Sequence, residues 1–202
     1  MKRLAFLLVL FLASASVFAQ PADKLLKNLQ DHFYKINDLS ADFTQLGNSS
    51  KISDGKIYYQ KGNKYRIELK NMTIVSNGES VWNYNKKDKK VVINNVTGEN
   101  SPFSLENIIV NYPKRSTVKS MGTEKIDGSE YSVLSFASKN DRSFRTAKIW
   151  FSAANFVKKV ELVDAQGGRY GFELSDIQIN KNLNSNRFSF QAPEGIKVID
   201  LR

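Results

Sequence analysis

The sequence contains no cysteine, a single histidine (His32) and only 4 prolines. Because disulfides are unavailable, an exported chain of this composition depends on an apolar core for its stability. The lack of cysteine also excludes an anchor built on a lipidated N-terminal cysteine. With one histidine and no thiol, the sequence argues against a zinc site and against a Cys/His nucleophile pair.

Motifs of catalysis and cofactor binding are equally scarce. The sequence has no glycine-rich phosphate loop, no serine-centred elbow and no metal-binding pattern. Acidic residues are plentiful, but they fall in turns or at polar strand positions, so no carboxylate pair stands out for acid–base chemistry. We therefore expect a protein that is not an enzyme and that uses neither a metal nor another cofactor.

One long apolar run is present, and it lies at the N-terminus. Lys2 and Arg3 precede the unbroken apolar stretch 4–12, and Val17-Phe18-Ala19 suits cleavage after Ala19. This pattern is typical of a cleavable secretory signal peptide over residues 1–19, and the run is shorter than the roughly 20 residues that span a bilayer. We therefore expect residues 20–202 to be the mature protein, exported and free of a membrane anchor.

Positive charge dominates the chain. There are 30 basic and 20 acidic residues, giving a net charge of +10, and removal of Lys2 and Arg3 with the leader lowers it to +8. The excess is spread over strands and turns, which suits contact with anionic membranes or acidic partners. No nucleic-acid motif is present, and export argues against nucleic acid as a partner. A module that binds another polyanion is an alternative that the charge leaves open.

Two stretches show the spacing of helices. Over Pro21–Asn37, apolar residues recur every three or four positions, which predicts a helix with one apolar stripe. His32 lies beside this stripe, and we expect it at the rim rather than as a ligand. Residues 101–102 suit a helix start, the run Phe103–Asn111 has mixed helical spacing, and Pro113 is expected to end it.

The remaining sequence is dominated by short alternating stretches. From Gly55 to Asn95, apolar and polar residues alternate with a period of two, which is typical of strands with one buried face. Asn77-Gly78 and Asp127-Gly128 indicate tight hairpin turns. Asp54-Gly55 is interpreted as a further turn, and Arg187–Phe190 as the last short strand.

These patterns together predict a mainly β protein with some helix. We expect about 11 strands in a single antiparallel sheet, joined as a meander and curled into an incomplete, open barrel. The N-terminal helix and the short mid-chain helix would cover its apolar face as a lid. No linker rich in proline or glycine and no internal repeat interrupts residues 20–202, so we expect one domain.

The alternation leaves the nature of the barrel interior open. A barrel with this many strands is wider than one filled by its own side chains, so inward residues can line a cavity. A solid core gives the same alternating pattern, and the two are equally compatible with the spacing.

Four segments, in order, resemble one known family. The N-terminal helix followed by LSADFTQ is similar to that family's opening, and GKIYYQKGNKYRIEL with TIVSNGESVWNYN is similar to its central block. NSPFSL resembles the loop before its lid helices, and FSFQAPEGIKVID resembles its closing segment. The family is that of the periplasmic outer-membrane lipoprotein carriers of LolA type, and the likeness covers nearly the whole mature chain.

This resemblance implies a function and a set of partners. It implies a periplasmic chaperone that takes the acyl chains of lipoproteins into an apolar cavity and delivers them to the outer membrane. The implied partners are acylated lipoproteins, an inner-membrane lipoprotein-releasing ABC transporter and, if one exists, an outer-membrane acceptor, with the carrier a monomer. An alternative on the same scaffold is a carrier or sensor for another acylated molecule or a glycolipid.

The resemblance also implies which residues line the cavity. The candidates are apolar or aromatic and come from the two helices and the first strands: Leu25, Leu29, Phe33, Ile36, Phe43, Ile57, Tyr59, Tyr65, Ile67, Leu69, Trp82, Phe103 and Ile108. Relatives often have Arg-Pro at the turn where this chain has Lys61-Gly62, and that arginine is associated with holding the lid closed. Lys61 is therefore the candidate latch, although a lysine lacks the planar, forked donor set of arginine.

Overall fold

The computed structural model describes residues 21–48, 50–96, 104–139 and 144–202. The predicted leader and Phe103 lie outside these ranges. The described strands are β1 (Asp38–Gly47), β2 (Ser50–Gln60), β3 (Lys64–Leu69), β4 (Met72–Asn77), β5 (Ser80–Asn85), β6 (Lys90–Asn95), β7 (Ser116–Ile126), β8 (Ser129–Ser138), β9 (Phe144–Phe151), β10 (Val157–Asp164), β11 (Arg169–Ile179) and β12 (Lys197–Asp200).

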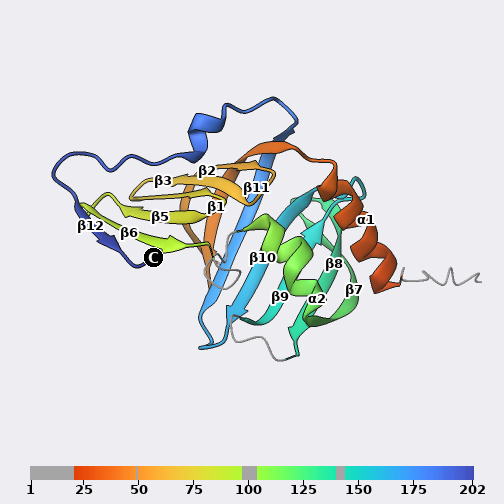
Figure 1. The fold of residues 1–202 in the computed structure, drawn as a ribbon. Coiled ribbons are helices and arrows are strands. Elements are labelled where there is room, and N and C mark those ends of the chain that lie inside the picture. The colour runs from red at the N-terminus through yellow and green to blue at the C-terminus, as the bar shows by residue number, and fades with distance from the viewer. Residues whose placement is uncertain (1–20, 49, 97–103, 140–143) are drawn as a thin grey trace, which may run out of the picture.

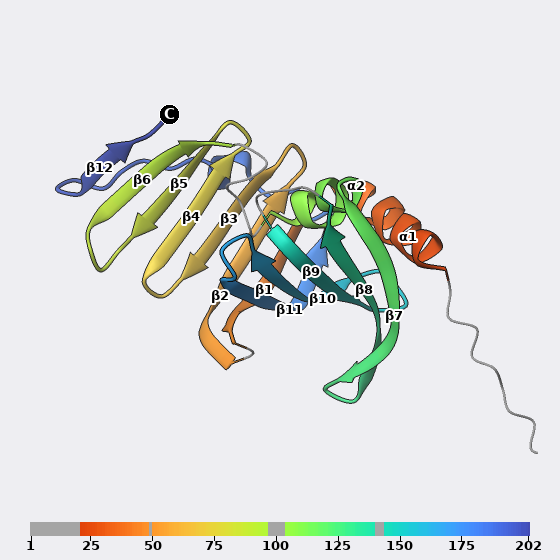
Figure 2. The same ribbon diagram turned by 90° about the horizontal axis from the view of Figure 1, so that it is seen from below.

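All twelve described strands form a single sheet in the order β12-β6-β5-β4-β3-β2-β1-β11-β10-β9-β8-β7 (Figures 1 and 2). Neighbours are antiparallel hairpins except at two places. β1 pairs with β11 from the far end of the chain, and β12 pairs with β6 in parallel. The predicted open, mainly antiparallel sheet is thus confirmed, with one parallel edge strand that the spacing did not predict.

Turns are found at most of the positions where the sequence predicted them. Asp127 and Gly128 adopt φ of 50° and 78° between β7 and β8, as a two-residue hairpin turn requires. Asp54-Gly55, however, is not a turn, because both residues lie inside β2. Gly55 is needed there for another reason: a Cβ atom at this position would lie 1.8 Å from the carbonyl oxygen of Glu68 on β3.

The first helix, α1 (Ala22–Tyr34), follows Pro21 and ends before β1. Leu29 and Phe33 of its apolar stripe are buried, as the spacing predicts. Tyr34 faces solvent, with half of its surface exposed.

The second helical segment continues farther than expected. It contains a π-helical turn, η1 (Asn107–Asn111), followed by a short α-helical turn, α2 (Tyr112–Lys114). Pro113 was expected to stop the helix and instead lies inside it. The wider π turn, with Tyr112 N–H donating to the carbonyl of Asn107 five residues earlier, accommodates a residue that has no N–H of its own.

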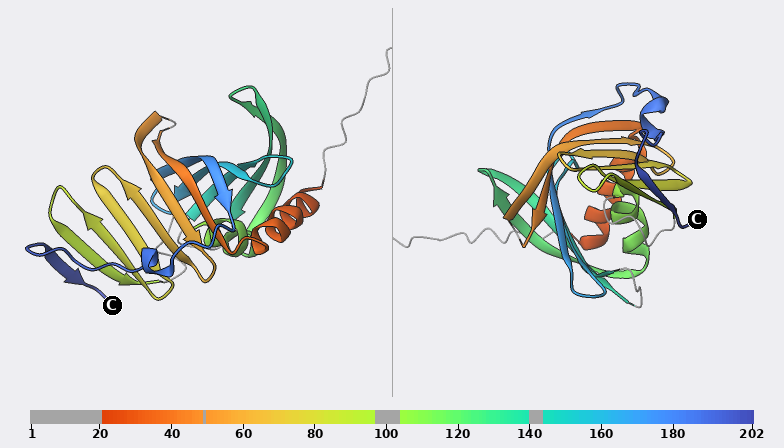
Figure 3. Two further views of the ribbon diagram at one scale, coloured as in Figure 1. Left: turned by 90° about the horizontal axis from the view of Figure 1, so that it is seen from above. Right: turned by 90° about the vertical axis from the view of Figure 1, so that its left-hand side faces the viewer.

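The sheet curls around the helices rather than lying flat beneath them. The right-hand view of Figure 3 shows the strands arching around α1 and α2. Both helices contact β7 and β8, and α1 also contacts η1. One continuous apolar core fills the space between the inner face of the sheet and these helices.

The outer face of the sheet carries a second apolar cluster, covered by residues 180–196, here called the C-terminal strap. The strap runs from β11 to β12 across the sheet (Figure 1) and contains a 3-10 helix, η2 (Ser185–Phe188), where a strand was expected. Phe188 is buried at 2% exposure, and the guanidinium of Arg187 lies 4.1 Å from the centre of the Tyr58 ring.

Asp38 fixes the start of the strap. Its buried carboxylate accepts hydrogen bonds from the backbone N–H groups of Lys181 at 2.8 Å and Asn182 at 2.9 Å. Backbone donors satisfy a buried carboxylate that would otherwise be costly. The first residue of β1 therefore sets the direction in which the chain leaves β11.

Candidate functional site

The interior under the helices brings together most of the predicted lining residues. Ten of them are buried within one apolar cluster, and Leu25 packs against its edge. The ten come from α1 and the turn that follows it, from the first three strands and from η1: Leu29, Phe33, Ile36, Phe43, Ile57, Tyr59, Tyr65, Ile67, Leu69 and Ile108.

The register of the strands explains why these side chains converge. Ile57 lies directly opposite Ile67, and Tyr59 directly opposite Tyr65, across β2 and β3. Residues directly opposite each other in an antiparallel pair share one face of the sheet. The Phe33 ring of α1 then closes over this face, with its centre 5.3 Å from that of Tyr59.

Tyr59 adds a phenol to this apolar surface without adding charge. Burial raises its pKa well above the usual value, and the nearby carboxylate of Glu106 acts in the same direction. The phenol is therefore neutral at physiological pH.

Trp82 is a correction to the predicted lining. It pairs with Val75 of β4, whereas Ile74, the neighbour of Val75, belongs to the interior cluster. Successive strand residues face opposite sides of the sheet, so Val75 and Trp82 lie on the outer face. The ring of Trp82 lies 6.5 Å from that of Phe190 in the C-terminal strap. Phe103, the other candidate not found in the cluster, lies outside the described residues.

The interior is closed and nearly full. A cavity of about 20 Å³ remains between α1 and the sheet, and it presents an apolar surface. That space holds roughly one water molecule. Leu29 and Phe33 of α1 line it, together with Ile36 just after that helix. The residues facing them come from the second helical segment, β10 and β11: Leu105, Ile109, Val157, Leu174 and Ile177.

Hydrogen bonds at the turn between β2 and β3 fasten both helical segments. Lys61 Nζ donates to the carbonyl oxygen of Tyr34, at the end of α1, at 2.8 Å. The backbone N–H of Asn63 donates to Glu106 Oε2 at 3.1 Å, and Ser104 Oγ donates to Asn63 Oδ1 at 2.7 Å. Lys61, the candidate latch, thus reaches the first helix, while Asn63 holds the second.

A further bond joins the two helical segments to each other. Gln30 Nε2 of α1 donates to the carbonyl oxygen of Ile109 at 2.9 Å. Pro113 lies four residues after Ile109 and has no N–H to offer that carbonyl. Sequence reasoning missed Gln30 and Asn63 because both are polar residues at ordinary surface positions, and only the fold shows what they reach.

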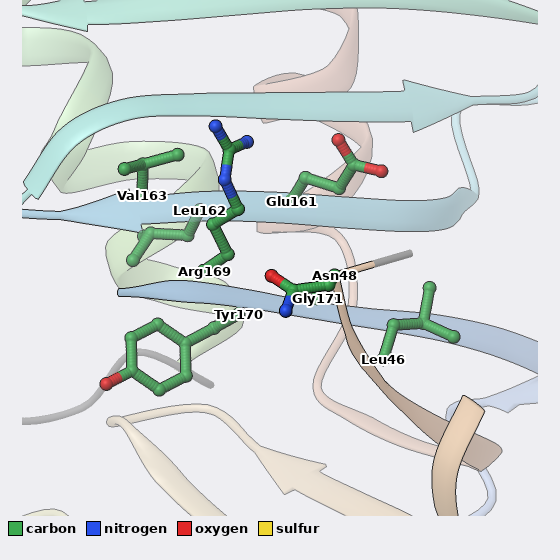
Figure 4. Close-up of a pocket in the computed structure, with 8 residues that line it drawn as sticks. All are labelled: Leu46, Asn48, Glu161, Leu162, Val163, Arg169, Tyr170 and Gly171. Atoms are coloured by element: carbon green, nitrogen blue, oxygen red, sulfur yellow. The ribbon is translucent and has the colours of Figure 1, made fainter. Parts of the chain in front are cut away.

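Two other hollows lie outside the interior. One, of about 50 Å³, is formed where β1, β10 and β11 approach each other, with Arg169, Glu161 and Tyr170 around it (Figure 4). The other is a groove of about 270 Å³ between the β9–β10 turn and the end of β11. Only the groove shares residues with the apolar cavity.

The described part of the chain holds no group of three or more residues suited to binding a metal ion. Among the helices described, none has the length and apolar character needed to cross a membrane.

Comparison with known proteins agrees with this geometry. The model of the family "Outer membrane lipoprotein carrier protein LolA" matches residues 34–191. The chain belongs to the LolA family. This is a family of periplasmic carriers rather than enzymes, in agreement with the expectation of no catalytic site.

Individual relatives match over almost their full length. An outer-membrane lipoprotein carrier protein of Francisella philomiragia is 25% identical, covering 99% of this chain and 98% of the relative. One from Psychromonas ingrahamii is 28% identical, covering 98% and 97% respectively. Among solved structures, an uncharacterized conserved protein of Thermus thermophilus has a similar fold, with a TM-score of 0.59 at 13% identity, covering 89% of this chain and 98% of the other.

Proposed function

We propose that this LolA-family protein shields the acyl chains of lipoproteins while they pass from the inner to the outer membrane. One observation carries the proposal. An apolar interior, assembled from residues expected to contact acyl chains, lies beneath helices that a small number of hydrogen bonds hold in place.

The energetics of acyl chains make such a carrier necessary. Each methylene exposed to water costs about 0.8 kcal/mol. Two or three long chains therefore oppose free diffusion through water by tens of kcal/mol at that rate. A protein that replaces water by apolar side chains removes much of this barrier.

Entry of cargo requires the helices to move. The residual cavity of about 20 Å³ is far smaller than the roughly 300–1,000 Å³ of ordinary ligand pockets. The closed form is therefore the empty carrier, and cargo shifts the population toward an open form in which α1 and the second helical segment have moved off the sheet. The bonds from Lys61, Asn63 and Gln30 set how much that opening costs.

The partners follow from this route. An inner-membrane ABC transporter would supply the lipoprotein, and an outer-membrane acceptor would receive it. A leader over residues 1–19, removed on export, would place the carrier between the two membranes.

Cargo identity is the direct test. The full chain is expressed with its leader, purified gently from the periplasm and examined by native mass spectrometry. We expect an acylated protein or lipopeptide bound to it. Free lipid or glycolipid alone would favour a carrier of other acylated molecules, and an empty chain that takes up no lipoprotein from spheroplasts would contradict the proposal.

A charge in the interior should abolish cargo retention. Phe33→Asp places a carboxylate against the acyl chains, and Tyr34→Asp places the same group on the solvent side of α1, where Tyr34 is half exposed. Burying an unpaired charge is strongly unfavourable, so we expect Phe33→Asp to lose at least tenfold in bound lipoprotein, with Tyr34→Asp at the wild-type level. Circular dichroism checks that the sheet remains folded. Equal retention by the two variants would count against the proposed site.

A further inference from the structure

The groove beside the β9–β10 turn adjoins the apolar cavity. The groove and the cavity share four apolar lining residues: Phe156, Val157, Leu174 and Ile177. Beyond them, the groove changes character, and its outer part is lined by polar and charged side chains: Tyr131, Ser152, Lys158, Ser175 and Asp176. The cavity and the groove together are called the passage here. This passage is amphipathic, with its apolar end under α1 and its polar end in solvent.

His32 lies in the cavity beside Phe156, one of the residues that the cavity shares with the groove. It lines the cavity from α1, and its ring meets that of Phe156 edge-on, with centres 4.7 Å apart and an angle of 76° between the planes. Its Nε2 atom is buried and has no hydrogen-bond partner among the described residues. The aromatic face beside it offers only a weak interaction to an N–H group.

An unpartnered polar atom in such a place calls for an explanation. A buried donor or acceptor without a partner costs free energy, and native structures rarely keep one without a role. Apart from Asn155, the other residues that line the cavity are apolar. Burial lowers the pKa of His32, and the charge of Lys35 acts in the same direction, so the imidazole is neutral near pH 7 and carries one N–H.

We infer that the groove is the entrance for an acyl chain, and that His32, as the tautomer with its proton on Nε2, donates a hydrogen bond from that atom to the carbonyl oxygen of the ester that joins the chain to its head group. The inference rests on the proposed carrier function. An acylated cargo has the same polarity profile as the passage: an apolar chain, a carbonyl at its end, then a polar head. Once the helices have moved and the cavity has widened, the chain lies in it, the carbonyl meets His32, and the head group lies among Lys158, Ser175 and Asp176.

Two probes separate the hydrogen bond from the apolar contact. The first is a synthetic fluorescent lipopeptide with two ester-linked palmitoyl chains. The second is its ether-linked analogue, which has chains of equal length and no ester carbonyl. Binding to the purified mature protein is measured by fluorescence anisotropy below the concentration at which the probes form micelles. The variants are His32→Leu, which removes the donor, and His32→Gln, which retains an N–H.

We expect His32→Leu to weaken binding of the ester probe by roughly threefold to tenfold, the range that one hydrogen bond gives. The same variant should leave the ether probe unchanged, and His32→Gln should restore much of the lost affinity. Equal effects on both probes, or none on either, would overturn the role of His32. Failure of the wild-type protein to bind either probe would instead overturn the carrier function itself.

A second variant tests the entrance. Phe156→Ala opens the boundary between the groove and the cavity without touching the bonds from Lys61, Asn63 or Gln30. We expect faster association of both probes, measured by stopped-flow fluorescence. Tyr170→Ala, a change of an exposed aromatic residue at the other hollow, should leave the rate at the wild-type value. An unchanged rate in Phe156→Ala would show that chains enter elsewhere.

Discussion

At Gly55, the sheet leaves no room for a side chain. The residue was interpreted from sequence as part of a turn, because Asp-Gly is common in turns. In the structure it lies inside β2, and the carbonyl oxygen of Glu68 occupies the place of a Cβ atom. A sequence shows that glycine is present, but the neighbour that requires it comes from another strand.

Gly55→Ala should therefore destabilise the fold. The obstacle is backbone, which cannot rotate away, so we expect a loss of about 2 kcal/mol in the free energy of unfolding, typical of overpacking. Gly47→Ala is the matched control, because the atom nearest to its new methyl group is the end of the Ile52 side chain, which can move. Urea unfolding of both variants measures the difference. Equal midpoints would show that β2 and β3 separate easily.

Trp82 shows that the alternation of apolar and polar residues along a strand does not always identify which face is buried. Period two divides a strand into two faces but does not tell which face is inside when both are apolar. Apolar residues lie on both faces of β5 here, since Val81 belongs to the interior cluster while Trp82 lies beside Phe190 of the C-terminal strap. The faces of β2 and β3 were assigned correctly, since their outer residues are polar or amphipathic, as at Lys56, Tyr58 and Arg66.

Among the elements, the two helical segments were predictable in existence but not in detail. The apolar stripe of α1 follows directly from its spacing. The π turn and the helical Pro113 do not, because propensity places a proline at a helix end. What compensates for this proline lies in α1, where Gln30 donates to the carbonyl of Ile109.

Removing this bond should loosen α1. Gln30→Leu keeps helix propensity and leaves the carbonyl of Ile109 without the amide donor, at a cost of about 1 kcal/mol. We expect amides of α1 to exchange with deuterium about fivefold faster, measured by mass spectrometry on peptides covering residues 22–34. Asn28→Leu, on the exposed side of the same helix, is the control and should exchange at the wild-type rate. Slower or unchanged exchange in Gln30→Leu would show that the bond does not hold the helices together.

At the scale of the whole molecule, an apolar cluster lies on each face of the sheet in the described part of the chain. The inner one faces the helices and lines the cavity, and the outer one lies beneath the C-terminal strap. The sequence predicted an open barrel with a helical lid, and the structure agrees. The sequence did not predict the C-terminal strap, because its apolar residues have no regular spacing. The parallel pairing of β12 was missed for the same reason, since four residues are too few to show a period.

A substitution in the outer cluster should lower stability without changing the affinity for lipopeptide. Phe188→Ala empties a buried site in the outer cluster, and we expect it to lower the free energy of unfolding by about 3–4 kcal/mol. Lipopeptide affinity of the folded fraction should not change, because Phe188 does not reach the cavity. Phe190→Ala, at a partly exposed position of the same strap, should cost less. Thermal unfolding and anisotropy measure the two quantities, and a loss of affinity in Phe188→Ala would mean that the faces are coupled.

The pairing of β1 with β11 also determines how late the sheet can be completed as the chain folds. Leu39 lies opposite Ile179, so the seam between the two halves of the sheet joins residues near opposite ends of the chain. A chain made or threaded from its N-terminus presents β1 long before its partner exists, and such distant pairings form slowly. Until β11 is present, the unpaired edge of β1 is available to pair with strands of other chains. The cavity therefore exists only once nearly the entire polypeptide is present, and an unfinished carrier has no place to hold cargo.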